Sequence, residues 1–344
     1  MIKEAKRKIQ VTGGFTHIVS LPIEWVKKMG LKKGDHVHLF LREDKTILIG
    51  EEKKRESLDI SITVDEKDSI EDIYRLVVAY YLVGYDFIKI IAPEEGFDKI
   101  YKKWFKNTAR KLLIGLDVVS ESNKEMILRC FINYEDFSFS NILNTMGNIV
   151  EIMYEDTVLS LKKGDTNLAR EVVQRDREVN RFYLFAIRQL IEAAEYNSIR
   201  KKIGIKDTTQ IFNYRLIVKN IERISDHIKK IGDSVIQTEN DSIDYPPQFF
   251  GITDNIKKLY IDSLNILFKN RVDEVNININ KAKELIEEVN LLKKDILTEE
   301  VAFSKKILFI TILNSLERIS GYLADINELI INMNIEKSNT YGNN

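Results

Sequence analysis

The chain has 344 residues, with 52 basic and 53 acidic side chains, so its net charge is close to zero. This length allows two or three domains with cores of their own. The balanced charge favours no class of partner for the chain as a whole. Four prolines and 15 glycines are few for 344 residues, which favours long helices over a loop-rich all-β protein.

The single cysteine, Cys130, excludes an internal disulfide and a cysteine-based zinc site. Because apolar residues flank it, we expect a strand residue with no chemistry of its own. No N-terminal segment resembles a signal peptide, and no apolar run approaches the ~20 residues of a membrane helix. These patterns predict a soluble, cytoplasmic protein that does not insert into a membrane.

The first fifty residues are expected to form short strands around one short helix. Strands are predicted over residues 3–11, 17–21, 37–40 and 46–49, with turns at residues 13–14, 31–35 and 43–45. Pro22 is placed to begin a helix over residues 23–29, which Gly30 ends. So few residues with this many strands cannot bury a large core alone.

This order of strand, Leu21-Pro22, short helix, Gly30 to Asp35 and hairpin resembles the AbrB/SpoVT family over residues 5–50. The resemblance implies a swapped-hairpin β-barrel, in which two chains interlace their hairpins. It also implies a homodimer that binds double-stranded DNA. We therefore expect residues 1–52 to be a DNA-binding domain.

Local charge agrees with contact to DNA. Residues 1–34 contain eight basic and only two acidic side chains. Such a surface can neutralise phosphates and release counterions, which makes affinity depend on salt. The candidate contacts are Lys6, Arg7, Lys8, His17, Lys27 and Lys28. The alternative is that the lysines form a solvated face and that His17 is a strand-end histidine without chemistry.

Residues 56–136, after a charged connector at 51–56, are predicted to form a small α/β domain that couples the two ends of the chain. Strands are expected over residues 58–64, 87–91, 116–119 and 126–132, and helices over residues 69–82 and 97–113. This segment contains no glycine-rich phosphate loop, metal-ligand spacing or catalytic grouping.

Residues 138–335 are predicted to be all-helical and duplicated. Helices are expected over residues 141–163, 166–196, 209–237, 253–269, 272–297 and 299–333, with a junction at Tyr245-Pro246-Pro247 and a polar tail at 336–344. The sequence Glu-Arg-Ile-Ser at residues 222–225 recurs at residues 317–320. Two further patterns recur in the same order: Tyr-x-Asp at residues 154–156 and 260–262, and Glu-Val-Asn at residues 178–180 and 288–290. Three recurrences in one order indicate a duplicated three-helix unit.

The helix over residues 216–235 contains Glu-Arg-Ile-Ser-Asp-His at 222–227. At these residues the chain resembles the PhoU phosphate-uptake regulators, over residues 138–335. The resemblance implies two repeated three-helix bundles and a role in phosphate homeostasis. The expected fold class is therefore multidomain α+β, with a swapped-hairpin barrel, a small α/β domain and an all-α PhoU fold.

Some PhoU proteins hold iron or zinc clusters on paired carboxylates of facing helices. Glu222 and Asp226 lie one helical turn apart and keep such a pair. The resemblance places Asp176 and Asn180 opposite them, and so implies one divalent iron or zinc ion on Asp176, Glu222 and Asp226. The corresponding positions of the second repeat are Ile286, Asn290, Glu317 and Gly321, of which three are not carboxylates.

The alternative for these carboxylates is ion pairing with nearby basic side chains, for example Arg175, Arg177, Arg181 and Arg223. His227 lies about 100° around the helix from Asp226, so we do not expect it to be a ligand.

The sequence contains no nucleophile with a paired base and no HExxH pair, so we expect no enzyme. The leading hypothesis is a DNA-binding transcriptional regulator of phosphate uptake. The second is a signalling adaptor of the phosphate ABC transporter, whose N-terminal module serves only for dimerisation. A third is an antitoxin-like or metal-binding module.

Overall fold

The computed structural model describes residues 4–41, 45–50, 55–97, 99–134, 136–238, 245–269, 271–298 and 302–335. The chain divides into two compact units, Met1–Lys53 (the N-terminal unit) and Lys54–Asn344 (the C-terminal unit). Each unit is described by itself. The predicted turn at residues 43–44, most of the connector at 51–56 and the polar tail at 336–344 lie outside the described residues.

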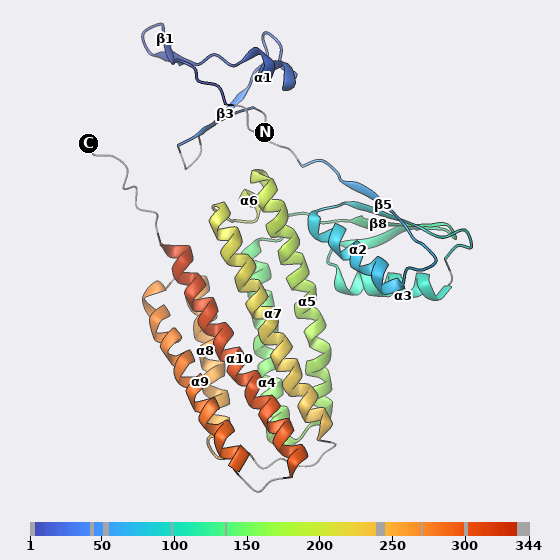
Figure 1. Cartoon of the computed structure of the whole chain (residues 1–344), viewed down its shortest axis with the longest axis vertical. Helices are drawn as coiled ribbons and strands as arrows, with labels where there is room; N and C mark the ends of the chain where they lie inside the picture. The colour runs from blue at the N-terminus through green and yellow to red at the C-terminus, as the bar shows by residue number, and fades with distance from the viewer. Residues whose placement is uncertain are drawn as a thin grey trace. The chain divides into compact units, whose positions relative to one another are not determined.

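The N-terminal unit consists of two hairpins and one short helix (Figure 1). Strands β1 (Gln10–Thr12) and β2 (Thr16–Ile18) pair antiparallel across the Gly13-Gly14 turn. Helix α1 (Ile23–Lys28) follows Pro22 as predicted. Strands β3 (His38–Leu41) and β4 (Ile47–Gly50) form the predicted second hairpin.

The predicted strand over residues 3–11 is longer than the structure shows. Of its described residues only Gln10 and Val11 belong to β1, and residues 4–9 have no regular structure. The physical reason is that a strand needs a hydrogen-bonded neighbour, and no described strand of this chain pairs with residues 4–9. Among the described residues from 4 to 50 only Gly50 is buried, which confirms that this unit has no core of its own.

The C-terminal unit begins with the predicted β-α-β-α-β-β order. Its elements are β5 (Asp59–Thr63), α2 (Ile70–Val83), β6 (Phe87–Ile91), α3 (Lys99–Leu112), β7 (Leu116–Glu121) and β8 (Glu125–Cys130). The sheet order is β5-β6-β8-β7, with β5 and β6 parallel and the other neighbours antiparallel. Helices α2 and α3 cover one face of this sheet (Figure 1).

Local sequence explains where these elements begin. Ser69 and Asp72 form a reciprocal capping box at the start of α2, and satisfy backbone donors that the first turn leaves free. Cys130 is the last residue of β8 and is buried, and burial raises the pKa of its thiol to about 11. The structure therefore confirms Cys130 as a strand residue.

The predicted helices of residues 138–335 are confirmed. They are α4 (Phe139–Lys163), α5 (Thr166–Glu195), α7 (Thr208–Gln237), α8 (Phe249–Lys269), α9 (Val275–Thr298) and α10 (Phe303–Asn334). Helices α4, α5 and α7 pack together, as do α8, α9 and α10, and α7 packs along α10 between the two bundles. The duplication inferred from Glu-Arg-Ile-Ser thus corresponds to two three-helix bundles.

Two short elements were not predicted. Helix α6 (Asn197–Lys202) lies between the predicted helices over residues 166–196 and 209–237, and a 3₁₀ turn, η1 (Val272–Glu274), precedes α9. In α6, Ile199 is buried and anchors the segment to the helical core. One apolar residue in a short basic helix is too weak a pattern to predict.

Two hydrophobic cores lie within the C-terminal unit. One fills the bundles and the other fills the space between the sheet and α2 and α3, and Leu82 and Ile132 contact both. The boundary that we placed between residues 136 and 138 therefore falls between two cores of one compact unit. Helix α10 is long and apolar enough to cross a membrane, but half of its apolar stretch is buried among the other helices.

Candidate functional site

The predicted DNA contacts are exposed in the N-terminal unit. Lys6, Arg7 and Lys8 precede β1, His17 lies in β2, and Lys27 and Lys28 form the last turn of α1. Apolar side chains of the same unit are exposed as well: Ile9 at 68%, Phe15 at 94%, Leu39 at 67%, Leu41 at 78% and Ile47 at 63%. The unit thus presents both cations and an unusually large apolar surface.

The predicted carboxylates come together between α5 and α7. Asp176 is buried, and its two oxygens accept hydrogen bonds from Ser225 Oγ at 2.6 Å and Asn180 Nδ2 at 3.0 Å. Lys229 Nζ lies 3.3 Å from the same carboxylate. Lys219 Nζ lies 2.6 Å from Glu222, which is also buried.

These acidic groups influence one another. Burial raises the pKa of Glu222, and the charges of Asp226 and Asp176 raise it further, although the hydrogen bond from Lys219 opposes this. Burial also raises the pKa of Asp226, with the charge of Asp176 as the next cause. The three carboxylates therefore lie within electrostatic range, as the sequence predicted for Asp176, Glu222 and Asp226.

Their cationic partners are not the arginines that we named as examples. Lysines on α7 hold Asp176 and Glu222, whereas Arg175 pairs with Asp156 at 2.5 Å and Arg223 lies over the ring of Tyr322. Both lysines lie on α7 within reach of these carboxylates. Lys219 is three residues before Glu222, and Lys229 lies across from Asp176 on α5. Ion pairing of Asp176 and Glu222 with nearby bases is thus confirmed, with lysines as the partners in place of the arginines named as examples.

The donor set does not fit a resident metal ion in this arrangement. In the part of the chain that the structure describes, no group of three or more His, Cys, Asp and Glu side chains is placed to hold one. Ser225, Asn180 and Lys229 already contact the two oxygens of Asp176, and Lys219 contacts Oε2 of Glu222. His227 faces Tyr322 of α10, with ring centroids 5.8 Å apart, and does not face Asp176.

The second repeat has one carboxylate at the corresponding place. Glu317 accepts a hydrogen bond from Asn290 Nδ2 at 3.3 Å and pairs with Lys293. The hydrogen bond from Lys293 lowers the pKa of Glu317. Each repeat therefore combines a carboxylate, an amide and a lysine, but only the first gathers three carboxylates.

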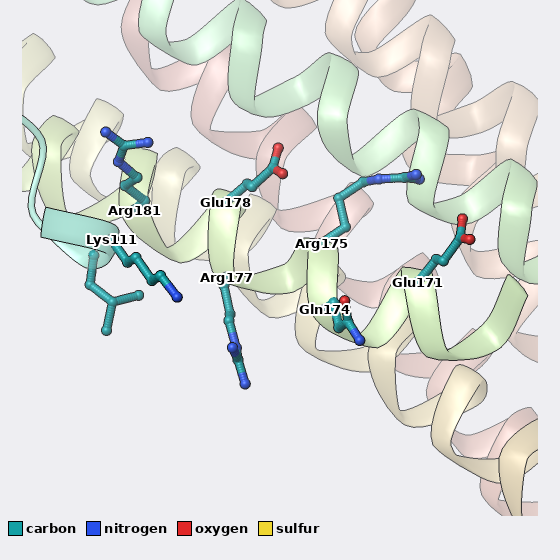
Figure 2. Close-up of a pocket in the computed structure, with 8 residues that line it drawn as sticks. Lys111, Glu171, Gln174, Arg175, Arg177, Glu178 and Arg181 are labelled. Carbon is teal, nitrogen blue, oxygen red and sulfur yellow. The ribbon is translucent and has the colours of Figure 1, made fainter. Parts of the chain in front are cut away.

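A cavity of about 400 Å³ lies between the end of α3 and the outer face of α5. Its lining includes four cations, Lys111, Arg175, Arg177 and Arg181, and two carboxylates, Glu171 and Glu178. Figure 2 shows Arg175 turned toward α4, where it pairs with Asp156, while Lys111 and Arg177 extend to the same side of α5. The sequence analysis missed this cavity because its cations come from helices about 70 residues apart.

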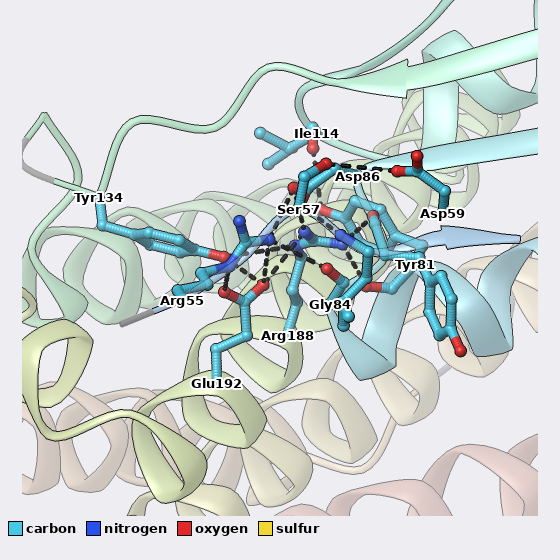
Figure 3. Close-up of polar contacts among 12 residues, drawn as sticks. Arg55, Ser57, Asp59, Tyr81, Gly84, Asp86, Ile114, Tyr134, Arg188 and Glu192 are labelled. Carbon is cyan, nitrogen blue, oxygen red and sulfur yellow. Dashed lines mark hydrogen bonds and ion pairs between the residues drawn. The ribbon is translucent and has the colours of Figure 1, made fainter. Parts of the chain in front are cut away.

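A second feature that was missed is a buried charge network between the sheet layer and α5 (Figure 3). Arg188 and Glu192 of α5 are almost fully buried and lie 3.1 Å apart. Arg55 bridges this pair to the sheet layer, with Nε 2.5 Å from Glu192 and Nη2 2.6 Å from Asp86. Tyr134 donates a hydrogen bond to Glu192 at 2.5 Å.

Backbone groups complete the network. Arg188 donates to the carbonyls of Tyr81 and Tyr85, at 2.5 and 3.1 Å, and Arg55 donates to that of Gly84 at 2.9 Å. Gly84 ends α2 with φ +102°, and a Cβ there would lie 3.1 Å from the side chain of Glu192. Glycine is therefore required both by the left-handed backbone and by the close approach of α5. The network clamps α5 to the end of α2.

Comparison with known proteins identifies both halves of the chain. The PhoU domain family matches residues 143–235, which run from α4 to α7, and the family "antidote-toxin recognition MazE, bacterial antitoxin" matches residues 10–59. A phosphate-specific transport system accessory protein PhoU homolog of Pseudomonas putida is 26% identical over 195 residues, covering 55% of this chain and 75% of its own. The homolog of Borreliella burgdorferi is 26% identical over 187 residues, covering 51% and 82%.

The PhoU structure from Streptococcus pneumoniae has the same helical fold, with a TM-score of 0.50 at 18% identity, over 56% of this chain and 91% of its own. The relatives are named as accessory or regulatory proteins of phosphate transport. It combines a C-terminal PhoU domain with an N-terminal domain of the MazE/AbrB antitoxin type.

Proposed function

We propose that the protein is a DNA-binding transcriptional regulator of phosphate uptake. In this function two N-terminal units interlace their hairpins into a swapped-hairpin barrel and dock as a homodimer on double-stranded DNA. The PhoU half then senses the phosphate state or binds a partner. Lys6, Arg7, Lys8, His17, Lys27 and Lys28 would contact the DNA.

The observation that carries this proposal is the missing core of the N-terminal unit. Leu39, Leu41 and Ile47 of the β3–β4 hairpin are each more than 60% exposed, and only Gly50 is buried among residues 4–50 that the structure describes. Burying apolar surface is the main driving force for association, at about 25 cal/mol per Å². A second copy would bury this surface and bring two sets of cations together on one dimer.

The start of the C-terminal unit supports a mechanical link to the helices. Arg55 is the second residue of that unit and pairs with Glu192 of α5 and with Asp86. The chain that leaves the N-terminal unit is thus anchored to a helix of the PhoU domain. Regulation would require two arrangements of the protein with different DNA affinity, between which an effector selects.

A second function is supported by a different observation. The two curated relatives match only about half of this chain, and they are accessory proteins of a phosphate-specific transport system. The PhoU half could therefore act as an adaptor of phosphate ABC transporter components, with the N-terminal unit serving only for dimerisation. Neither function requires the divalent iron or zinc ion that we predicted on Asp176, Glu222 and Asp226, which stays a prediction.

The test is fluorescence anisotropy of the full-length protein with labelled duplexes. The duplexes come from the region upstream of its own gene and from phosphate-transport promoters, with a scrambled duplex for comparison, at two salt concentrations. We expect promoter-selective binding that weakens steeply with salt, because each neutralised phosphate contributes a slope of about −0.9. Equal, weak binding to every duplex would favour the adaptor.

Matched variants test whether DNA binding depends on contacts of particular residues or only on the total charge of the protein. Arg7→Ala with Lys8→Ala should weaken binding and reduce the salt slope, without loss of the dimer. Lys162→Ala with Lys163→Ala removes the same charge from exposed positions of α4 and should change neither. Loss of the dimer in the first variant would contradict a contact role for these two residues.

A further inference from the structure

The outer face of α5 has a cluster of cations that the proposed function does not use. Lys111 in the last turn of α3 and Arg177 and Arg181 on α5 line the cavity of about 400 Å³. The charge of the fourth cation, Arg175, is already compensated by Asp156 at 2.5 Å. For the other three, the described part of the chain provides no ion pair.

The guanidinium of Arg181 lines the same cavity, but it extends to the other side of α5 from Lys111 and Arg177 (Figure 2). Its Nε–H is buried, has no hydrogen-bond acceptor among the described residues and has no surface that a ligand in the cavity could reach. Lys111 and Arg177 are therefore the two cations that one ligand group can contact together.

The chemistry of the lining selects the ligand. Guanidinium groups bind phosphate oxygens through paired N–H donors, and a lysine adds a point charge. The carboxylates of Glu171 and Glu178 extend away from Lys111 and Arg177 in Figure 2, so they do not neutralise that end of the cavity. Carboxylates at the rim can accept hydrogen bonds from hydroxyl or amino groups.

We propose that this cavity binds the phosphoryl group of a small phosphorylated molecule, held by Lys111 and Arg177. A volume of about 400 Å³ is larger than one phosphate ion needs and is within the usual range for ligand pockets. The ligand would contact α3 of the sheet layer and α5 of the PhoU domain at once. This site is independent of the DNA-binding proposal and stands if that proposal fails.

Isothermal titration calorimetry of the full-length protein tests the site, with ATP and inorganic phosphate as the two probes. We expect Lys111→Ala and Arg177→Ala each to weaken binding at least tenfold. Arg170→Ala, an exposed arginine of the same helix outside the cavity, should change it less than twofold. Binding of ATP but not of phosphate would identify a phosphate ester as the occupant, and equal binding of both would identify the free ion.

Three results would overturn the proposal. They are no heat with either probe at millimolar concentration, an equal loss in the Arg170→Ala control, and a fall in duplex-DNA affinity in Lys111→Ala with Arg177→Ala as large as in Arg7→Ala with Lys8→Ala. The last result would make the cations part of a nucleic-acid surface. Urea denaturation of each variant verifies that a lost signal does not come from unfolding.

Discussion

The N-terminal and C-terminal units solve the problem of burial in opposite ways. Among the described residues of the first unit only Gly50 is buried, whereas the second contains two hydrophobic cores and even buries the charges of Arg188 and Glu192. A buried ion pair is tolerated only in a rigid, fully hydrogen-bonded setting. The C-terminal unit thus buries its cores within one chain, whereas the described apolar side chains of the N-terminal unit stay exposed, as the proposed dimer requires.

The largest effect is expected where the C-terminal unit depends on buried charge. Arg188→Met should lower the free energy of unfolding by about 3 kcal/mol, because it leaves Arg55 as the one described cation beside the carboxylates of Glu192 and Asp86. Urea denaturation followed by circular dichroism measures this value. The exposed control Arg170→Met on the same helix should stay within about 0.5 kcal/mol.

A small effect of Arg188→Met would show that the clamp between the sheet layer and α5 does not hold the unit together. Should the single variant fail to fold, Arg188→Met with Glu192→Leu provides the second measurement. Replacing both partners removes the unpaired carboxylate, so this variant should recover part of the lost stability.

The next prediction concerns the surface of the N-terminal unit. Leu39→Asp should raise the dissociation constant of the dimer at least 100-fold, about 3 kcal/mol, because it puts a charge into the expected interface. Leu291→Asp on α9 is the matched control, because Leu39 and Leu291 are exposed to 67% and 59% in the single chain. Sedimentation velocity over a range of concentrations measures both.

If the two leucine variants behave alike, the apolar surface of the hairpin is not an interface. The single chain gives no reason for any difference, since both side chains lie on its surface. A selective effect at Leu39 therefore reports on a partner copy. Unfolding of the C-terminal unit in either variant would be visible in the same circular dichroism signal.

The accuracy of the sequence-based predictions also differs between the N-terminal and C-terminal units. The strand and helix order of residues 58–132 and the duplicated bundles came from periodicity and from the recurrence of Glu-Arg-Ile-Ser, which depend on neighbours along the chain. The length of the strand predicted over residues 3–11 was wrong, because it depends on a pairing strand, and no described strand of this chain pairs with residues 4–9. Local pattern is thus sufficient only where the contacts that decide are local.

The candidate sites show the limit more sharply. Helical spacing placed Glu222 and Asp226 on one face, and the resemblance to PhoU proteins placed Asp176 opposite them. The structure brings the three carboxylates within electrostatic range, and their role as metal ligands stays a prediction. The burial of Arg188 was missed because Arg55 and Asp86 lie more than 100 residues away in sequence. An arginine between Ile187 and Gln189 has no local feature that distinguishes it from a surface residue.

The two repeats give a smaller contrast that metal binding can test. Lys219 and Lys229 hold the carboxylates of the first repeat, so replacing both by alanine should raise the affinity for Zn²⁺ about tenfold, because two charged hydrogen bonds no longer compete. Zinc titration with a competing chromophoric chelator measures this. Lys293→Ala in the second repeat should give no such gain, because Glu317 has no second carboxylate beside it.

Added zinc affinity in Lys293→Ala equal to that of the double variant would contradict the assignment of any metal to the first repeat. A second control, Asp176→Asn in the double-lysine background, should abolish the gain. Mass spectrometric metal analysis of the protein as purified shows whether iron or zinc is present before any variant is made.

The smallest effect concerns the pH dependence of stability at His227 in the C-terminal unit. Three of the four histidines, His17, His36 and His38, lie in the N-terminal unit, and His227 lies in the C-terminal unit. Burial lowers the pKa of His227 from 6.5 to about 4, and the charges of Lys230 on α7 and Arg318 on α10 add to this. Nδ1 of this ring is buried without a hydrogen-bond partner among the described residues.

Since the folded state keeps His227 neutral, the unfolded state binds more protons between pH 6.5 and 4. Its contribution to stability is complete above pH 6.5 and is lost as the pH falls to about 4. Allowing for partial exposure, we expect on the order of 1 kcal/mol. The raised pKa values of Glu222 and Asp226 act in the opposite direction, so the difference between wild type and His227→Gln is the quantity to measure.

Denaturation midpoints at pH 7 and pH 4.5 give this difference. His227→Gln should lose less stability than wild type on acidification, because glutamine does not titrate at all. Equal losses would mean that the imidazole gains a proton in the folded state without cost, and that the seam between α7 and α10 opens to water there. In that case the loss of stability on acidification would come from groups other than His227 and its contact with Tyr322.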